Sequence, residues 1–123
     1  MEPVATRAQV LEVLAAERSR LRELGVADLR IFGSFARDEA GPKSDLDVLV
    51  RFQAGRKSYD TFLNLSEWLE EVTGRPVELL TREGLSPYLG PLILRESVDV
   101  PLGEVATTKV SDLRQPIAAL LDD

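Results

Sequence analysis

The sequence has 123 residues, the size of one domain that can bury a single core. Its 21 acidic and 15 basic residues leave a formal charge of −6, which argues against a dedicated DNA- or RNA-binding surface. The chain has neither cysteine nor histidine, which excludes zinc sites with the usual ligands and Ser-His or Cys-His nucleophile pairs. Any catalysis must therefore use carboxylates, hydroxyls, lysine, arginine and hard metal ions.

No apolar run approaches the length of a membrane span, and the first residues lack the charged and apolar regions of a secretory signal. The absence of cysteine also fits a reducing compartment. We therefore expect a cytoplasmic protein with no membrane partner and no direct nucleic-acid partner.

The first half of the chain predicts a helix followed by two strands. Apolar residues recur at helical spacing over residues 6–24. The short apolar run 26–32 predicts a strand that ends at Gly33, and a short helix is expected to open at Ser34. Residues 45–52 are rich in β-branched side chains and predict a second strand.

The second half predicts two more helices and two more strands. A helix is expected over residues 58–73, with an apolar face made of Tyr59, Phe62, Leu63, Leu69 and Val72. Residues 77–81 predict a third strand. Residues 86–98 predict a short helix that a Gly-Pro pair interrupts in its first half, and residues 98–102 predict a fourth short strand.

This order predicts an α/β (α+β) fold in which helices are layered on a small sheet of three to four strands. One domain is expected over residues 1–103. Residues 104–123 are expected to form a tail, in which the weakly amphipathic patch 117–121 is an extra helix or a mobile end.

Two carboxylates share one face of the second predicted strand. Side chains alternate along a strand, so Asp45 and Asp47 both point away from the apolar face. Their Cα atoms are expected about 7 Å apart, which lets both carboxylates converge on one point. Ionised carboxylates held together repel unless a cation lies between them, and such oxygen clusters bind Mg²⁺.

Glu78 is a candidate third acid. It alternates with Val77 and Leu79, so it faces away from the core when those two side chains face in. If the third strand pairs beside the second, Glu78 lies next to Asp47. Acids in this arrangement suit two metal ions about 3.5–4 Å apart, a recurring device for in-line attack at phosphorus.

A Gly-Ser turn lies just upstream of these acids. Gly33 lets the backbone approach a ligand closely, and Ser34 is expected to begin a helix whose free N–H groups suit an anion. We interpret the turn as the seat of a phosphate chain, with Arg37 as an additional cation one turn along. Taken separately, each feature also fits a plainer role: a surface turn, a solvated Asp pair, an edge-strand Glu, or an Arg paired with a surface acid.

The stretch "GSFARDEAGPKSDLDVLV", residues 33–50, resembles the G-S-x-A-R-G-E…S-D-[ILV]-D signature of the minimal nucleotidyltransferases. These proteins belong to the polymerase-beta-like nucleotidyltransferase superfamily. The similarity extends over about residues 6–100, because "PVELLTREGLSPYLGPLILRESVDV" is also similar to the end of the family's domain.

The resemblance implies a mixed sheet flanked by helices, and transfer of a nucleoside monophosphate, usually AMP from ATP, to a hydroxyl group. It implies that Gly33 and Ser34 hold the triphosphate, that Asp45 and Asp47 bind two Mg²⁺ ions, and that Glu78 binds the catalytic one. Many members are antitoxins that add AMP to a tyrosine of a HEPN-domain ribonuclease toxin. Such a toxin is therefore the expected protein partner.

Two positions depart from the family pattern. Glu78 stands where Asp is commoner, and its extra methylene moves the carboxylate. Asp38 replaces a commoner Gly and adds a negative charge beside the expected phosphate site. Two rival functions stay open: a non-catalytic antitoxin that masks its partner's surface, and an enzyme that modifies a small molecule such as an aminoglycoside.

Overall fold

A four-stranded mixed sheet organises the chain in a computed structural model that describes residues 2–102. The strand order is β3-β2-β1-β4. Strand β1 (Val26–Phe32) pairs antiparallel with β2 (Leu46–Phe52) and with β4 (Val98–Asp99), whereas β3 (Val77–Thr81) pairs parallel with β2. The expected small mixed sheet, including its short fourth strand, is confirmed.

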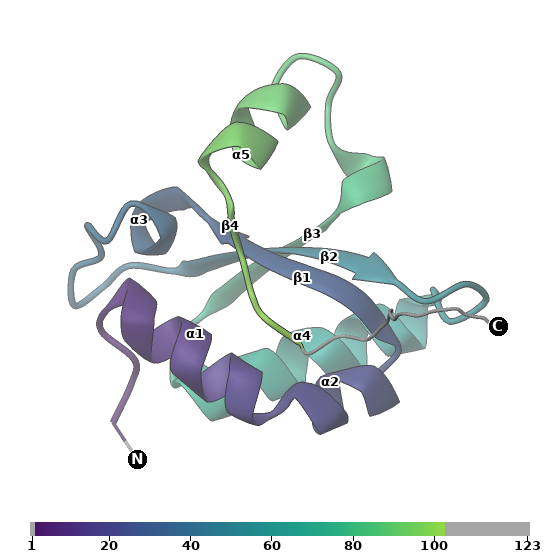
Figure 1. Ribbon diagram of the computed structural model, residues 1–123, viewed down its shortest axis with the longest axis horizontal. Helices are drawn as coiled ribbons and strands as arrows, with labels where there is room; N and C mark the ends of the chain where they lie inside the picture. Colours follow the sequence, from purple (N-terminus) through teal and green to yellow (C-terminus); the bar gives the residue numbers. More distant parts are fainter. Residues whose placement is uncertain (1, 103–123) are drawn as a thin grey trace, which may run out of the picture.

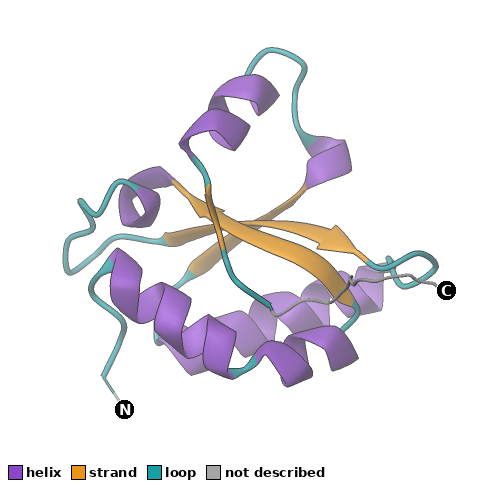
Figure 2. Cartoon of the chain, viewed as in Figure 1, coloured by secondary structure: helices purple, strands orange, loops and turns teal. Residues whose placement is uncertain are grey.

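The helices divide between the two faces of the sheet (Figures 1 and 2). Helices α1 (Arg7–Ala16), α2 (Arg18–Glu23) and α4 (Tyr59–Thr73) cover one face. Helix α5 (Gly90–Glu96) and the 3-10 turn η1 (Arg82–Gly84) stand on the opposite face. The two faces of the sheet are therefore covered by different elements.

The hydrophobic core fills the space between the sheet and α1, α2 and α4. Alternate β2 side chains point into it, as the period of two in a strand requires. The buried residues include Val10, Leu14, Leu21, Leu29, Ile31, Leu46, Val48, Val50, Leu65 and Leu69. The opposite β2 positions hold Asp47, the buried Leu49 and the exposed Arg51, so that face carries both polar and apolar side chains.

The first predicted helix is in fact two helices that meet at Glu17. Its N–H donates to the carbonyl of Leu14, three residues back, at 3.1 Å, so the helical ladder is broken there. The Arg18 guanidinium satisfies the carbonyl of Ala15 at 3.2 Å. The prediction of one continuous helix over residues 6–24 was therefore wrong at this point.

The predicted apolar face of α4 is partly wrong. The helical period places Phe62, Leu65, Leu69 and Val72 in one stripe against the core. Tyr59 and Leu63 are turned away from that stripe, and their side chains are exposed.

Helix α5 begins at the Gly-Pro pair that was expected to interrupt it. Proline has no N–H, and the first turn of a helix needs none, so Pro91 fits there. The predicted tail 104–123, with its patch at 117–121, lies outside the described residues. Within residues 2–102, no helix is both long enough and apolar enough to cross a membrane.

Candidate active site

Asp47 and Glu78 lie side by side on neighbouring strands. They are Cα partners in the parallel pairing of β2 with β3, and Phe32 is the partner of Asp47 on β1. Because Val48 and Leu79 are buried in the core, alternation directs Asp47 and Glu78 to the opposite face of the sheet. The structure thus places Glu78 beside Asp47, as the sequence predicted.

Gly33 is required by its contact with Asp47. Its φ of +70° lies in the left-handed region, which L side chains rarely adopt. A Cβ atom on residue 33 would overlap Oδ2 of Asp47. The glycine between β1 and the next helix therefore lets the backbone approach a carboxylate closely, which is a sharper constraint than turn chemistry alone.

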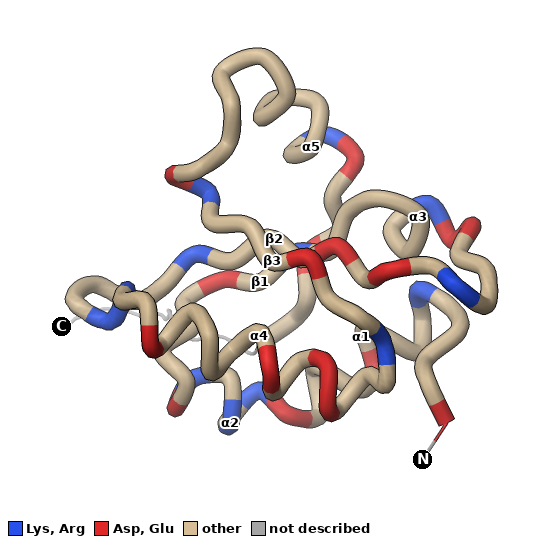
Figure 3. Tube along the Cα trace, turned by 180° about the vertical axis from the view of Figure 1, so that it is seen from behind, with Lys and Arg blue, Asp and Glu red and all other residues tan. Residues whose placement is uncertain are grey.

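Asp47 holds its proton more tightly than an ordinary aspartic acid. Burial is the largest cause, and the charge of Glu78 and a hydrogen bond with it come next. The charges of Asp45 and Glu96 add to these effects, and together they raise the pKa of Asp47 to about 6. Figure 3 shows acidic positions along this part of the molecule, between the labels of β3 and α3.

Asp45, Asp47 and Glu78 offer the oxygen ligands that Mg²⁺ prefers. Among residues 2–102, no three acidic side chains are already gathered closely enough to hold a metal ion. Asp45, just before β2, and Glu78 are exposed, so both side chains have room to rotate toward an ion, whereas Asp47 is held against Gly33. This donor set fits a magnesium site that closes as the ion binds.

Ser34 lies in α3 (Gly33–Ala36), between β1 and β2, and is half-buried. The helix has four residues, which is barely one turn and too short to build a substantial helix dipole. The anion donors available here are individual N–H groups and the Ser34 hydroxyl.

Arg37 and Gly33 share one acidic partner, Glu96 at the end of α5. The Gly33 N–H donates to Oε2 of Glu96 at 2.9 Å, and Nη1 of Arg37 donates to Oε1 at 3.0 Å. Nε of Arg37 also donates to Glu39 at 3.0 Å, and the bonds to Glu39 and Glu96 raise the pKa of Arg37. The sequence analysis missed Glu96, which lies about sixty residues away along the chain.

Arg75 holds the loop that precedes Asp45, and the sequence analysis missed it too. Its buried guanidinium donates to three carbonyls of that loop, from Gly41 at 3.0 Å, Pro42 at 2.9 Å and Ser44 at 3.3 Å. It also donates to the carbonyl of Val4 at 2.8 Å. A single arginine between the helix-ending glycine and β3 gives no sequence signal for this role.

Asp38 has a partner that the sequence did not predict. Its φ of +60° explains why glycine suits this position, and Asp is one of the few other residues that tolerate it. Its carboxylate accepts the N–H of Arg7 at 3.0 Å, at the start of α1. The added negative charge therefore lies at the N-terminus of a helix, where it is favourable.

A mixed sheet with strand-borne acids facing a Gly-Ser turn is the arrangement of a nucleotidyltransferase. The chain belongs to the nucleotidyltransferase domain family, whose model matches residues 13–100. The expected family and enzyme class are thereby confirmed.

Relatives and solved structures agree with this assignment. Protein adenylyltransferase MntA of Thermococcus cleftensis is 36% identical over 96 residues, which cover 77% of this chain and 96% of that protein. A solved minimal nucleotidyltransferase is 39% identical with a TM-score of 0.61, and the match covers 72% of this chain and 93% of that one.

Two toxin–antitoxin complexes share the fold at lower identity. One contains AMP-PNP and matches with a TM-score of 0.57 at 17% identity, over 76% of this chain and 71% of that one. The other is a tri-AMPylated Shewanella oneidensis HEPN toxin with its MNT antitoxin. It matches with a TM-score of 0.53 at 16% identity, over 73% of this chain and 71% of that one.

Proposed function

We propose that this protein is a metal-dependent adenylyltransferase that moves AMP from ATP onto a tyrosine hydroxyl of a HEPN-domain ribonuclease toxin, and so acts as its antitoxin. The name of the Thermococcus relative supports a protein acceptor. The AMP-PNP in one toxin–antitoxin complex supports a nucleotide substrate, and the tri-AMPylated HEPN toxin in the other supports a HEPN toxin as partner.

The observation that carries the proposal is the pairing of Asp47 with Glu78 next to Gly33. The parallel register sets two carboxylates side by side on the face of the sheet away from the core. The contact between Asp47 and Gly33 brings them beside the backbone that is expected to receive the phosphate chain. This meeting of acids and anion donors supports the proposal, because a metal-bound triphosphate needs both.

Asp45, Asp47 and Glu78 would hold two Mg²⁺ ions. Bound magnesium would neutralise charge on the triphosphate and favour the ionised form of the acceptor hydroxyl. The carboxylates suit this task, because a cation would offset the repulsion among them, which adds to burial in raising the pKa of Asp47.

The protein's own groups would bind and orient the nucleotide. The N–H groups at Gly33 and Ser34 and the Ser34 hydroxyl donate to phosphate oxygens, and Arg37 offsets their charge. The acceptor oxygen then forms a bond to the α-phosphorus, the bond from that phosphorus to the bridging oxygen breaks, and pyrophosphate leaves. Holding both reactants in line supplies much of the rate enhancement.

The proposal is tested with the purified protein, the HEPN toxin encoded beside it, Mg²⁺ and ATP labelled at the α-phosphate. We expect label on a toxin tyrosine, and none when ATP is labelled at the γ-phosphate instead. Asp47→Asn should abolish the transfer. The matched control, Asp60→Asn, changes an exposed acid at the start of α4 and should transfer label normally.

Other outcomes would contradict the proposal and identify a rival. Neutralisation of the toxin by Asp47→Asn without label transfer would favour an antitoxin that acts by masking. Transfer of label to an added aminoglycoside, and not to the toxin, would favour a small-molecule acceptor.

A further inference from the structure

One carboxylate already occupies the donors that the triphosphate is expected to use. The side chain of Glu96 accepts from the Gly33 N–H at 2.9 Å through one oxygen and from Arg37 at 3.0 Å through the other. A bridging carboxylate of this kind has the charge and acceptor atoms of a phosphate group. The anion position beside α3 is thus filled by the protein itself.

We propose that Glu96 is an internal competitor of the triphosphate, and that its side chain must leave Gly33 and Arg37 before a nucleotide can bind there. This inference rests on the function proposed above. It adds to the site a residue that sets nucleotide affinity without contacting the transferred AMP.

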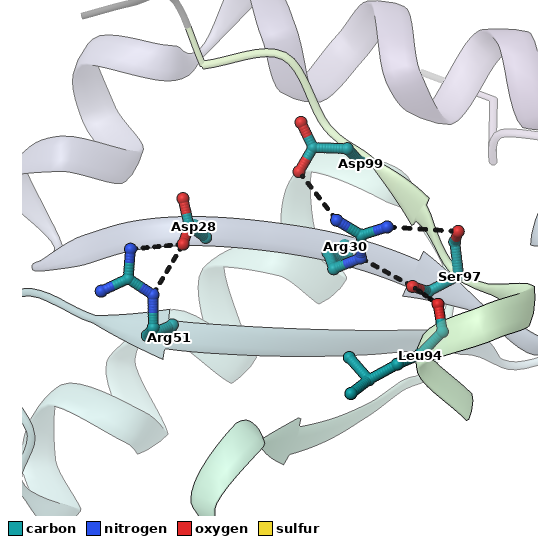
Figure 4. A network of polar contacts seen from close by, with 6 residues as sticks. All are labelled: Asp28, Arg30, Arg51, Leu94, Ser97 and Asp99. Atoms are coloured by element: carbon teal, nitrogen blue, oxygen red, sulfur yellow. Dashed lines mark hydrogen bonds and ion pairs between the residues drawn. The ribbon is translucent and has the colours of Figure 1, made fainter. Parts of the chain in front are cut away.

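The backbone next to Glu96 is anchored, so only the side chain needs to move. Arg30 on β1 donates to the Ser97 hydroxyl at 2.6 Å and to its carbonyl at 3.4 Å, and pairs with Asp99 at 3.4 Å. The Ser97 hydroxyl in turn donates to Leu94 at 2.8 Å, and Figure 4 shows these contacts fastening the end of α5 to the sheet. Rotation about the bonds of the Glu96 side chain is therefore the route to release.

The displaced carboxylate would stay close to the site. Its backbone is fixed by its neighbour Ser97, and about one-third of its side chain is exposed, so it has solvent to turn into. There its charge still opposes a polyphosphate across a short distance. It is also in position to take back Gly33 and Arg37 when pyrophosphate leaves, which would hinder rebinding of the product.

The surrounding charges make this competition effective. Asp45, Asp47 and Glu78 neighbour the same site, and Glu39 is the second acidic partner of Arg37. A nucleotide without its metal ion therefore meets acids on several sides. Magnesium would offset the charges of the first three acids. The carboxylate of Glu96, by contrast, leaves the donors at Gly33 and Arg37 only when its side chain is displaced.

The test measures the affinity of AMP-PNP at a fixed Mg²⁺ concentration by calorimetry, for the wild type, Glu96→Gln and Glu39→Gln. Both substitutions remove one charge from Arg37, but only the first weakens the competitor on the Gly33 N–H. We expect Glu96→Gln to lower the Kd about two- to fivefold, the effect of an exposed ion pair. Glu39→Gln should change it clearly less.

A second readout follows pyrophosphate as a product inhibitor. Its inhibition constant should fall in Glu96→Gln by a factor similar to that for AMP-PNP, because the same donors are released. Thermal unfolding of each variant checks that the fold is intact.

Three results would overturn the inference. If Glu96→Gln binds AMP-PNP no more tightly than Glu39→Gln, Glu96 does not compete, and the proposed function stands. If Glu96→Gln binds more weakly than the wild type, Glu96 holds the donors in place instead of blocking them. If neither the wild type nor Glu96→Gln binds AMP-PNP, the nucleotide site and the inference fail together.

Discussion

At the scale of single residues, the site depends on close approach. Gly33 and Asp47 are in contact because residue 33 has no Cβ, and Asp47 and Glu78 are neighbours because their strands are in register. Both features lower the stability of the folded protein. A left-handed backbone and adjacent carboxylates cost free energy, which is common at functional sites.

We predict that Gly33→Ala abolishes most of the activity, whereas Gly55→Ala does not. Both glycines have a positive φ, +70° and +78°, so alanine should cost about 1–2 kcal/mol at either position. At residue 33 the new methyl group also displaces Asp47, whereas no atom lies within 4 Å of a Cβ at residue 55. Displacing a reacting group by about 1 Å can cost about 100-fold in rate.

The measurement compares the rate of AMP transfer with the free energy of unfolding for both variants. Equal loss of activity in the two would contradict a specific role for the contact between Gly33 and Asp47.

We predict that Asp47→Asn is inactive but more stable than the wild type in the absence of metal. The ordinary pKa of 3.8 rises to about 6 in the folded protein, so folding favours the protonated form. The contribution of Asp47 to the free energy of unfolding is most favourable below pH 4. It falls as the pH rises to about 6 and stays low above that pH. An asparagine at this position does not titrate, so its contribution to the free energy of unfolding does not change with pH in this way.

Thermal unfolding in a chelating buffer between pH 4 and pH 8 checks this prediction. The advantage of Asp47→Asn over the wild type should grow up to about pH 6 and then level off. A constant difference across the range would show that Asp47 titrates normally.

At the scale of elements, buried polar contacts fix the segments that carry the site. Arg75, just before β3, ties down the 41–44 loop that leads into β2. Its guanidinium also lies over the ring of Phe35 in α3, with 5.3 Å between Cζ of Arg75 and the ring centroid. One side chain thus connects three segments around the acids.

We predict that Arg75→Met lowers the free energy of unfolding by about 2–3 kcal/mol, because buried carbonyls lose their donor. It should also slow AMP transfer, since the loop before Asp45 is released. Arg20→Met is the matched control: Arg20 pairs with Glu23 at 3.2 Å and is half exposed, so about 0.5 kcal/mol or less is expected. Denaturant unfolding measures both values, and similar losses would contradict the role of Arg75.

We predict that Asp38→Gly is more stable than Asp38→Ala, although alanine is usually the more stabilising residue in a helical region. Both variants lose the bond to the N–H of Arg7, but only alanine keeps a Cβ at a φ of +60°. The difference should be about 1 kcal/mol in denaturant unfolding. The reverse order would mean that residue 38 leaves this conformation in the variants.

At the scale of the whole molecule, the two faces of the sheet do separate work. The apolar core lies between the sheet and α1, α2 and α4, whereas the acids project from the face beneath α5. We therefore expect folding not to need the magnesium proposed for this site. The chain also has enough apolar burial for its size without disulfides.

We predict that a chelator stops AMP transfer and leaves the protein folded. Far-ultraviolet circular dichroism should be unchanged, and added Mg²⁺ should raise the melting temperature of the wild type but not of Asp47→Asn. Unfolding on chelation would instead indicate a structural metal site.

Much of the fold followed from local pattern. Strand alternation placed Asp47 and Glu78 opposite the core, and the strand-ending glycine marked the turn before α3. Arg75 and Glu96 could not be predicted in this way, because their partners lie tens of residues away and meet them only through the tertiary fold. Periodicity also gave no signal for the split of the first helix at Glu17.

Because β2 and β3 pair in parallel, the placement of Asp47 beside Glu78 does not depend on the length of the connection between the two strands. The chain between these strands runs through the exposed turn at residues 54–57 and then through α4. The register of β2 and β3, and not this connection, sets which residues of the two strands are partners. Extra residues inserted in that turn would leave Asp47 opposite Glu78. A shift of one position in the register of β3, by contrast, would turn Glu78 toward the hydrophobic core and Leu79 toward solvent. We therefore expect that turn to accept inserted segments, whereas an insertion within β3 would break the pairing of Asp47 with Glu78.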